Sequence, residues 1–508
     1  MLDPFTPGRV FCVGTAGSGV RAMAELLHGF GWTVAGTDRG KPDVLARMRA
    51  KGLAVTHDSG GRSWDERPDL LLYSPAVPST DGARQRAAAE GVPQATHIDL
   101  LAELTKRRET IAVAGTHGKS STAALLVHLL RCSGRRVAGF VGAEPVDPNY
   151  SFADPDPELL VVEACEWNRH FLRLSPTHAV MTGVEFDHPD SYRDAAELEA
   201  AFEEFCREIH SRAVQFWQED CFAFGEAPRF LLYSNDSPGA RRAAKSCGET
   251  LVRGEAYGDY GEAGGYEPAP DGSAVTMRLF LPEQGEPLRF PVPQHSHPDN
   301  VGFAIAAADY FLRRTDGLWR HHLVSTRDFL RGDVSAATNG DLVDRFTAAL
   351  RSAPALRRRF ETLGDWHGRT VIDDYAHHPT ALRETRAKAQ RAGTSGRAAV
   401  LFQPHQLART EGLFMKFAGA LSGYAAAAVL PVFPARETAS GEQCAALSRR
   451  LAEAAGATFL PDLDALPRWA DDSTRPGDAL VLAGAGDIDR ARDLLFPGVP
   501  GARPSPGT

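Results

Sequence analysis

The chain has 508 residues, of which 43% are hydrophobic and 24% are charged, and its formal net charge is −9. This length exceeds what one hydrophobic core usually supports, so we expect about two to four domains of an ordinary globular kind. The acidic balance argues against a nucleic-acid-binding protein, whose binding face is usually basic. An anionic ligand would therefore have to be bound by local groups.

The seven cysteines are scattered along the chain without a CxxC pair. Their odd number and spacing argue against a disulfide framework or a structural zinc site, and they favour a cytoplasmic, reducing environment. The start, MLDPFTPGRVFCVG, has an acidic residue before its apolar run and does not resemble a signal peptide. Since no apolar stretch approaches the roughly 20 residues that span a bilayer, we expect no membrane insertion.

The first block of the sequence has the pattern of a parallel α/β unit. An apolar strand, VFCV, is followed by GTAGSG, an amphipathic helix pattern and a second strand, TVAGTD. Gly14, Gly17 and Gly19, with Asp38 on the second strand, look superficially like a dinucleotide fingerprint, although Ala16 stands where a glycine is expected. From this pattern alone, an NAD-dependent dehydrogenase remains an alternative.

A second strand, loop and helix follow in TIAVAGTHGKSSTAALLVHLL, with the loop at Gly115 to Ser120. Small residues there would let backbone N–H groups surround a polyphosphate at the helix N-terminus. Lys119 would reach the β- and γ-phosphates, and the Ser120 hydroxyl would contact magnesium. Val113 occupies the place of the first glycine of the usual P-loop, so a plain glycine turn with a surface lysine is the alternative interpretation.

The later part of the chain divides into two regions. The stretch from Gly254 to Gln294 is rich in Gly, Pro and acidic residues, which predicts irregular chain or short antiparallel strands. A third α/β block begins near RRRFETLG, and its apolar runs AAVLFQPH and ALVLAGAGD each end in polar or glycine-rich segments. Ligand groups of α/β domains gather at such strand ends.

Several of these segments together resemble the Mur ligase family. GTHGK resembles the phosphate loop of its alanine-adding branch, and the segments that follow in the family's order are VVEACEWNRHFLRLSP, VMTGVEFDHPDSY, RRRFETLG, VIDDYAHHPT, LFQPHQLART and VLAGAGDI. The resemblance implies an α/β protein of three domains. These are a Rossmann-like UDP-sugar domain (1–108), a P-loop-like ATPase domain (109–353) and a Rossmann-like acceptor domain (354–508).

The resemblance also implies an ATP-dependent ligase that joins L-alanine to the carboxylate of UDP-N-acetylmuramate, with Mg²⁺ or Mn²⁺, in peptidoglycan synthesis. A carboxylate is a poor electrophile, so ATP must first convert it to an acyl phosphate. Magnesium and Lys119 would neutralise the repulsion between the phosphates and the carboxylate. There is no lysine between Lys119 and Lys245. This fits the alanine-adding branch, whereas several other Mur ligases place a carbamylated lysine beside the second metal.

The family pattern assigns roles to individual positions. The implied metal ligands are Ser120, Glu163 and His188, and the implied phosphate-stabilising guanidinium is Arg359. The residues implied to contact ATP are Gly115, Thr116, His117, Gly118, Lys119, Ser120, Ser121, Asn300 and Asp374. Those implied to contact the UDP-sugar are Gly14, Gly17, Ser18, Gly19, Asp38 and Ser74. Those implied to bind the amino acid are Tyr375, His377, His405 and Arg409.

Three departures from the family pattern keep other functions open. Gly183 replaces an asparagine, Asp299 and Phe303 replace a histidine and an asparagine around Asn300, and Gln406 replaces an arginine. One alternative is a recycling ligase that attaches a preformed murein tripeptide. The other is a degenerate homologue that binds UDP-sugars without turnover. The sequence predicts nothing about oligomeric state.

Overall fold

The computed structural model describes residues 3–58, 64–219, 230–234, 236–245, 256–257, 266–269, 273–277, 288–315, 337–435 and 437–497. By their contacts these residues form two compact units. The first comprises 1–185 and 195–354, and the second comprises 186–194 and 355–508. The second unit thus includes a short piece of the middle of the chain, the 186–194 segment. The predicted domain boundaries after residues 108 and 353 remain predictions.

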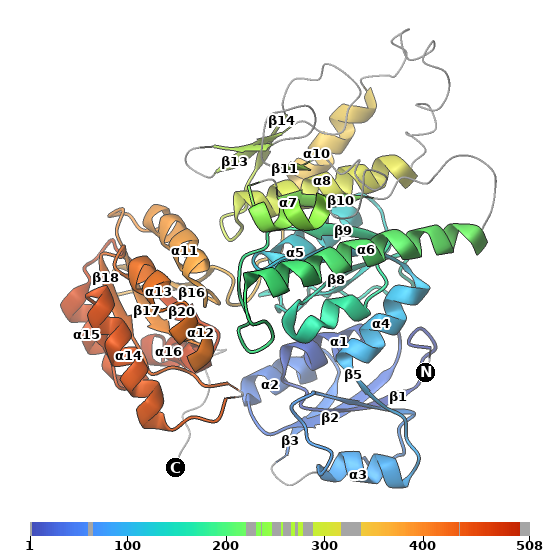
Figure 1. Cartoon of the computed structure of the whole chain (residues 1–508), viewed down its shortest axis with the longest axis horizontal. Coiled ribbons are helices and arrows are strands. Elements are labelled where there is room, and N and C mark those ends of the chain that lie inside the picture. Colours follow the sequence, from blue (N-terminus) through green and yellow to red (C-terminus); the bar gives the residue numbers. More distant parts are fainter. Residues whose placement is uncertain are drawn as a thin grey trace. The chain divides into compact units, whose positions relative to one another are not determined.

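The N-terminal part of the first unit contains a five-stranded parallel sheet, drawn in blue tones in Figure 1. Its strands, in the order β3-β2-β1-β4-β5, are β1 (Arg9–Val13), β2 (Thr33–Asp38), β3 (Ala54–His57), β4 (Leu70–Tyr73) and β5 (Gln94–Thr96). Its helices are α1 (Ser18–Gly29), α2 (Pro42–Ala50), α3 (Gly82–Ala89) and α4 (His97–Arg107). The strand order reverses beside β1, and the chain leaving β1 carries the glycine-rich loop. Ligands of open α/β sheets bind at such a reversal.

A second parallel sheet, of six strands, follows in the same unit. In the order β11-β10-β9-β6-β8-β7 its strands are β6 (Glu109–Ala114), β7 (Val137–Phe140), β8 (Leu159–Glu163), β9 (His178–Met181), β10 (Leu231–Ser234) and β11 (Ala256–Tyr257). The helical elements are α5 (Lys119–Cys132), η1 (Trp167–Arg173), α6 (Ala195–Glu219), α7 (Pro238–Lys245), α8 (Pro298–Thr315) and α10 (Ala337–Arg351). Strand β6 is apolar from Ile111 to Ala114 and fully buried there, as expected for a central parallel strand.

The region predicted to be irregular or antiparallel contains, among its described residues, three short antiparallel strands. They are β12 (Tyr266–Pro268), β13 (Ala274–Met277) and β14 (Leu288–Pro291). This small sheet packs against α10, since Phe290 of β14 is buried and lies against Phe346 of that helix.

The second unit contains a six-stranded sheet in the order β15-β16-β20-β17-β18-β19. The strands are β15 (Glu361–Trp366), β16 (Arg369–Asp374), β17 (Ala398–Gln403), β18 (Ala426–Val429), β19 (Thr458–Phe459) and β20 (Ala479–Gly484), and β15 alone among them is antiparallel to its neighbour. The helical elements are α11 (Pro379–Ala392), α12 (Leu407–Gly412), α13 (Phe414–Leu421), α14 (Gly441–Ala455), η3 (Leu463–Ala465), α15 (Leu466–Ser473), η4 (Asp487–Arg490) and α16 (Ala491–Leu495).

Both faces of this sheet are covered. Val400 and Phe402 of β17 belong to one buried apolar cluster, while Leu401 between them belongs to another. This alternation follows from the two-residue period of a strand and explains the continuous apolar run AAVLF. Across the described helices, none has the length and apolar character that crossing a membrane requires.

Close packing joins the two sheets of the first unit at the end of α1. A Cβ atom at Gly29 would overlap the Cβ of Ala153, which follows β7 in the chain. We therefore expect Gly29→Ala to lower the free energy of unfolding by about 1–3 kcal/mol, the usual cost of overpacking. The midpoint of urea unfolding measures this.

Gly419→Ala in α13 is the matched control, since a Cβ there would meet no atom within 4 Å. Alanine is the better helix former, so this control should be neutral or stabilising by roughly 0.5–1 kcal/mol. If Gly29→Ala unfolds at the wild-type urea midpoint, the contact between α1 and Ala153 accommodates the added methyl group without loss of stability, and the prediction is wrong.

Candidate active site

The glycine-rich loop after β1 is held in place by Asp38. One carboxylate oxygen accepts a hydrogen bond from the Ala16 N–H at 2.8 Å, and the other accepts one from the Gly40 N–H at 2.7 Å. Gly14 has a φ of +77°, and a Cβ there would lie 3.0 Å from that of Ser74, so the loop needs glycine at this point. Asp38 and Ser74, both predicted to bind the UDP-sugar, thus also shape the loop.

Helix α1 begins directly after this loop and has an uncapped N-terminus. Gly17 occupies the cap position, has no side chain to accept from the first N–H groups, and is exposed together with Ser18. Uncapped N–H groups and the helix dipole favour a bound anion. The positions predicted for the diphosphate, Gly17, Ser18 and Gly19, therefore lie where an anion could be bound.

The phosphate loop between β6 and α5 depends on two glycines. Gly115 has a φ of +124° and Gly118 one of +77°. A Cβ at Gly115 would overlap the Thr182 hydroxyl, and one at Gly118 would overlap the Asn300 side chain. The loop is also fixed from outside, because the Thr116 N–H donates to the Gly183 carbonyl at 2.8 Å.

Gly183, the first departure from the family pattern, lies beside this loop, and so does Asn300. Gly183 contributes its backbone, and a Cβ there would meet only Ser237 at 3.8 Å, so a methyl group would fit. Asn300 accepts a hydrogen bond from the Thr122 hydroxyl at 3.3 Å, which ties the start of α8 to α5. Ser121 lies in the first turn of α5.

The two substituted residues near Asn300, Asp299 and Phe303, are placed differently. Phe303 is 2% exposed and forms part of the core. It is therefore not available to stack on a nucleotide base in this structure. Asp299 is half-exposed, lies 3.6 Å from His297 and is in the first turn of α8.

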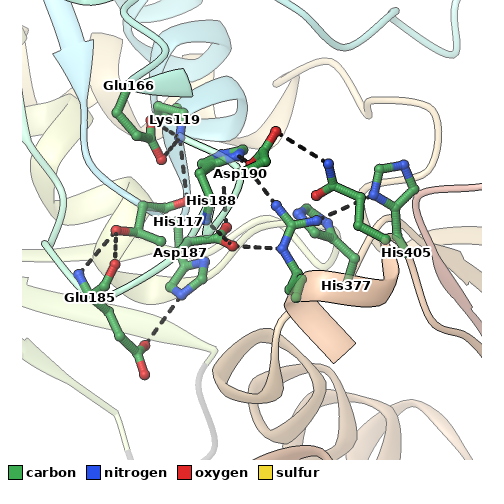
Figure 2. A network of polar contacts seen from close by, with 12 residues as sticks. His117, Lys119, Glu166, Glu185, Asp187, His188, Asp190, His377 and His405 are labelled. Carbon is green, nitrogen blue, oxygen red and sulfur yellow. Dashed lines mark hydrogen bonds and ion pairs between the residues drawn. The ribbon is translucent and has the colours of Figure 1, made fainter. Parts of the chain in front are cut away.

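Lys119 is held by a carboxylate that the sequence did not predict. Its ammonium lies 2.8 Å from Glu166 Oε2 and 2.6 Å from the Gly115 carbonyl (Figure 2). Glu166 is fully buried, so its charge is neutralised mainly through this pair. Burial would lower the pKa of Lys119, but the carboxylates of Glu166 and Glu163 outweigh it and raise that pKa. Lys119 is therefore a cation fixed in position at the phosphate loop.

Two of the three predicted metal ligands lie side by side. The Ser120 hydroxyl donates to Glu163 Oε2 at 2.8 Å, and the Gly142 N–H donates to the same oxygen at 2.8 Å. A hydroxyl and a carboxylate are the hard oxygen donors that Mg²⁺ prefers. The donor set therefore fits the metal that the family uses.

His117 of the phosphate loop lies close to Glu185, which follows β9 in the chain. The His117 Nε2 is 3.4 Å from a Glu185 carboxylate oxygen, and Thr116 exchanges two hydrogen bonds with the Glu185 backbone (Figure 2). These contacts connect the GTHGK segment with the TGVE segment, as their joint presence in the family pattern suggests.

In the second unit, the 186–194 segment is fastened by a buried ion pair. Arg409 Nε lies 2.6 Å from Asp187 Oδ1, with side-chain exposures of 2% and 3% (Figure 2). The same guanidinium lies 3.4 Å from His188 Nδ1 and 3.2 Å from His405 Nδ1. The pKa of Asp187 lies well below its ordinary value, because His188 and Arg409 outweigh the effect of burial.

These contacts bear on two predicted roles. Arg409, predicted to bind the amino acid, already has a carboxylate partner in the chain. His188, predicted to bind metal, has a φ of +55° and contacts Arg409 within the second unit. Gln406 donates to Asp190 at 3.3 Å, so its amide also has a protein partner.

His377 and His405, both predicted to bind the amino acid, lie near Arg409. The His377 ring lies 5.2 Å from the Tyr375 ring and 6.1 Å from the His405 ring, between centroids. Burial and the charge of Arg409 lower the pKa of His377, so it is neutral. Its Nδ1 lies 2.8 Å from the Tyr375 carbonyl, which can only accept. Nδ1 therefore carries the proton, and Nε2 is left as an acceptor.

In the RRRF run, Arg358 holds neighbouring parts of the second unit together, and the phosphate-stabilising role of Arg359 stays a prediction. Arg358 donates to the Gly484 carbonyl at 2.6 Å and the Gly486 carbonyl at 3.1 Å, and its Nε is 3.4 Å from Asp373. It thus fastens the VLAGAGDI loop to β16. Arg359, predicted to stabilise phosphate, lies over the Tyr375 ring at 4.8 Å.

Asp374, predicted to contact ATP, also organises its own surroundings. One oxygen accepts from the Ala376 N–H at 3.0 Å, and the other accepts from the Thr385 hydroxyl at 3.2 Å. Burial raises the pKa of Asp374. Burial also lowers the pKa of the neighbouring Lys388, to about 7.

Four residues of the site were not identified from the sequence: Glu166, Asp187, Arg358 and Gly142. The first three are charged residues within the quoted family segments, one to three positions from a predicted residue. Their charge and their position within a family segment could therefore have identified these three residues as candidates. Gly142 acts through its backbone, and residue type gives no indication of that.

Comparison with known proteins identifies the family. The family model described as the Mur ligase middle domain matches residues 113–238, and the one described as the Mur ligase glutamate ligase domain matches residues 358–486. A UDP-N-acetylmuramate–L-alanine ligase from Roseiflexus sp. (strain RS-1) is 32% identical over 95% of this chain and 97% of its own length. The ligase of the same name from Rubrobacter xylanophilus is 30% identical over 96% and 99%.

Solved structures show the same fold. The UDP-N-acetylmuramate-alanine ligase from Thermotoga maritima matches with a TM-score of 0.65 and 22% identity, over 96% of this chain and 98% of the other. A murein peptide ligase from Psychrobacter arcticus matches with a TM-score of 0.62 and 19% identity, over the same shares. The predicted fold class is thereby confirmed.

Three α/β sheets, a phosphate loop with its fixed lysine, and a carboxylate beside the loop's hydroxyl define an ATP-dependent ligase that forms amide bonds. Within that class the chain belongs to the Mur ligase family, as its matches over nearly the full length show. The family resemblance predicted from the sequence is confirmed.

The buried pair in the second unit leads to a stability prediction. Arg409→Met should lower the free energy of unfolding by about 3–5 kcal/mol, because it leaves the buried Asp187 charge uncompensated. Adding Asp187→Asn should recover part of the loss. Both are measured by urea unfolding. An arginine that served only the substrate would instead raise KM for the amino acid and leave unfolding unchanged.

A pH dependence follows from Asp373. Burial raises the pKa of Asp373 to about 7, although Arg358 opposes it. The native protein therefore keeps a proton that the unfolded chain releases above about pH 4. This group's contribution to stability falls as pH rises from about 4 to 7, by at most about 1.4 kcal/mol per pH unit.

Asp373→Asn should accordingly flatten the decline in unfolding free energy between pH 5 and 7, measured by urea unfolding at several pH values. Asp472→Asn, at a side chain 70% exposed, is the matched control and should retain the wild-type slope. Equal slopes in all three proteins would mean that Asp373 is ionised across this range.

Proposed function

We propose that this chain joins L-alanine to the carboxylate of UDP-N-acetylmuramate, using ATP and Mg²⁺ or Mn²⁺, in a cytoplasmic step of peptidoglycan synthesis. The observation that carries the proposal is the cluster of Lys119, Ser120 and Glu163, in a chain that matches ligases of that name over 95% of its length. The substrates are those in the names of these relatives. The geometry provides the lysine, hydroxyl and carboxylate that such a ligase needs.

The nucleotide would bind at the phosphate loop. The N–H groups at the start of α5 and the Lys119 ammonium would meet the β- and γ-phosphates. Ser120 and Glu163 would hold the metal, with His188 as a further candidate, and the metal would neutralise phosphate charge. The sugar nucleotide would place its diphosphate at the start of α1, beside Gly17 and Ser18.

The reaction would proceed in two displacements. A carboxylate oxygen of the sugar attacks the γ-phosphorus of ATP, ADP leaves, and an acyl phosphate forms. The amine of L-alanine then attacks the carbonyl carbon, and the tetrahedral intermediate expels inorganic phosphate to leave the amide. The attacking amine loses a proton, and the free Nε2 of the neutral His377 is an acceptor of suitable chemistry.

The test is ADP release by the purified protein with Mg²⁺, with and without UDP-N-acetylmuramate and L-alanine, and the mass of the product. ADP and an alanyl product that require both substrates support the proposal. Product formed only with the L-alanyl-γ-D-glutamyl-diaminopimelate tripeptide would identify the recycling ligase instead. Binding of the sugar nucleotide without ADP under either condition would identify a binding protein.

We expect Lys119→Ala to lower the rate of ADP formation by at least about a hundredfold, because removal of one group that stabilises transition-state charge typically costs that much. Binding of UDP-N-acetylmuramate, measured by calorimetry, should persist, since its site is assigned to the N-terminal sheet. Lys106→Ala is the control, because Lys106 is a half-exposed lysine of α4 paired with Glu103.

Lys119→Ala leaves the buried Glu166 without its partner, so Lys119→Met with Glu166→Gln provides a version without an unpaired charge. Loss of sugar-nucleotide binding in both forms, with unchanged thermal unfolding, would overturn the assignment of the two ligands to separate sheets.

A further inference from the structure

Arg21 connects the glycine-rich loop of the N-terminal sheet with the central sheet. Its backbone N–H donates to the Gly17 carbonyl at 2.8 Å, in the first turn of α1. The residue is 5% exposed. Its guanidinium donates to the Gly142 carbonyl at 2.9 Å and to Glu25 at 3.2 Å. The Arg21 side chain therefore has one fixed direction, toward the chain that follows β7.

The Gly142 peptide links Arg21 to Glu163 through two hydrogen bonds, one at its carbonyl and one at its N–H. The Gly142 N–H donates to Glu163 Oε2 at 2.8 Å, the same oxygen that accepts from Ser120. A Cβ at Gly142 would lie 3.0 Å from that oxygen, so the backbone packs directly against the carboxylate. A positive charge at the Gly142 carbonyl end polarises the chain of hydrogen bonds and strengthens the next one.

A second contact from the N-terminal sheet holds the same loop. Glu144 is 8% exposed, and its carboxylate lies 3.0 Å from Arg47 and 3.8 Å from Lys51, both in or directly after α2. Burial would raise the pKa of Glu144, but Arg21 and Arg47 outweigh it and lower that pKa. The loop from Gly142 to Glu144 is thus attached at two points to the helices of the N-terminal sheet, where the UDP-sugar is predicted to bind.

We propose that Arg21 is a positioning residue for Glu163: through the Gly142 peptide, the N-terminal domain fixes the carboxylate that would hold the metal. The proposal takes from the proposed function only that Glu163 and Ser120 bind a divalent cation. Loss of a group that orients a metal ligand typically weakens metal binding about 10- to 100-fold. Arg21 acts through one intervening peptide, so the expected loss is about three- to tenfold.

The experiment measures binding of Mn²⁺ in the presence of ADP by electron paramagnetic resonance, using the full chain and no other substrate. Arg21→Met should weaken Mn²⁺ binding about three- to tenfold, and Arg21→Lys should recover part of the loss. Binding of ADP without metal should stay at the wild-type level in both. The control is Arg49→Met, which removes an arginine that donates to the Val55 carbonyl at 3.1 Å within the N-terminal sheet.

Gly142→Ala tests the same link without touching the N-terminal domain. Its Cβ would press on Glu163 Oε2, and Gly142 has no positive φ, so Mn²⁺ binding should weaken while the fold is kept. This variant serves if Arg21→Met does not fold.

Wild-type Mn²⁺ affinity in Arg21→Met or in Gly142→Ala would overturn the proposal. So would an equal weakening of metal-free ADP binding, which would indicate a general loosening of the unit. The measurement involves no turnover and no sugar nucleotide. Failure of the ligase assay would therefore leave this result standing, and the reverse also holds.

Discussion

The buried pair of Lys119 and Glu166 is the constraint around which the phosphate site is built. A lysine that is 11% exposed needs a negative partner, and Glu166, with an exposure of 0%, supplies it at 2.8 Å. Because the partner comes from the chain after β8, the pair fixes the distance between the phosphate loop and the strand that ends in Glu163. The phosphate loop, the lysine and the candidate metal ligand thus form one unit, and a change to any of them disturbs the others.

The same principle extends outward from this pair. Glu163 receives hydrogen bonds from Ser120 and from Gly142, and Gly142 is in turn held by Arg21 of the N-terminal sheet. Each charged or polar group that comes close to the phosphate loop is therefore oriented by a partner on a different element. Such supporting contacts are what keep a site preorganised. On the proposal above, the N-terminal domain would also help to position a metal ligand.

The strands and loops of the site could be predicted from the sequence because their pattern is local. Glycines at 115 and 118, the apolar run of β6 and the helix pattern of α5 all lie within a few positions of each other, and the structure shows why each glycine is needed. The pairing of charges could not be predicted in this way. Arg358 has a φ of +59° and contacts the carbonyl groups of Gly484 and Gly486, and nothing in the RRR run indicates which of its arginines makes these contacts. Likewise, the burial of Phe303 is decided by packing of α8, not by its place in a ligand-binding segment.

The role of Arg409 illustrates how far residue type can lead and where tertiary context takes over. An arginine that follows a strand end is a reasonable partner for a substrate carboxylate, and the sequence pattern does not indicate Asp187 as its partner. In the folded unit, however, Asp187 comes from a segment 222 residues earlier in the chain and takes the guanidinium at 2.6 Å. An arginine held this way has little free capacity for a second carboxylate, although its remaining N–H groups still face His188 and His405. Its contribution to substrate binding would then be indirect, by fixing the two histidines. The role of Arg409 in binding the amino acid stays a prediction, and the structure adds that this guanidinium also orients Asp187 and the two histidines.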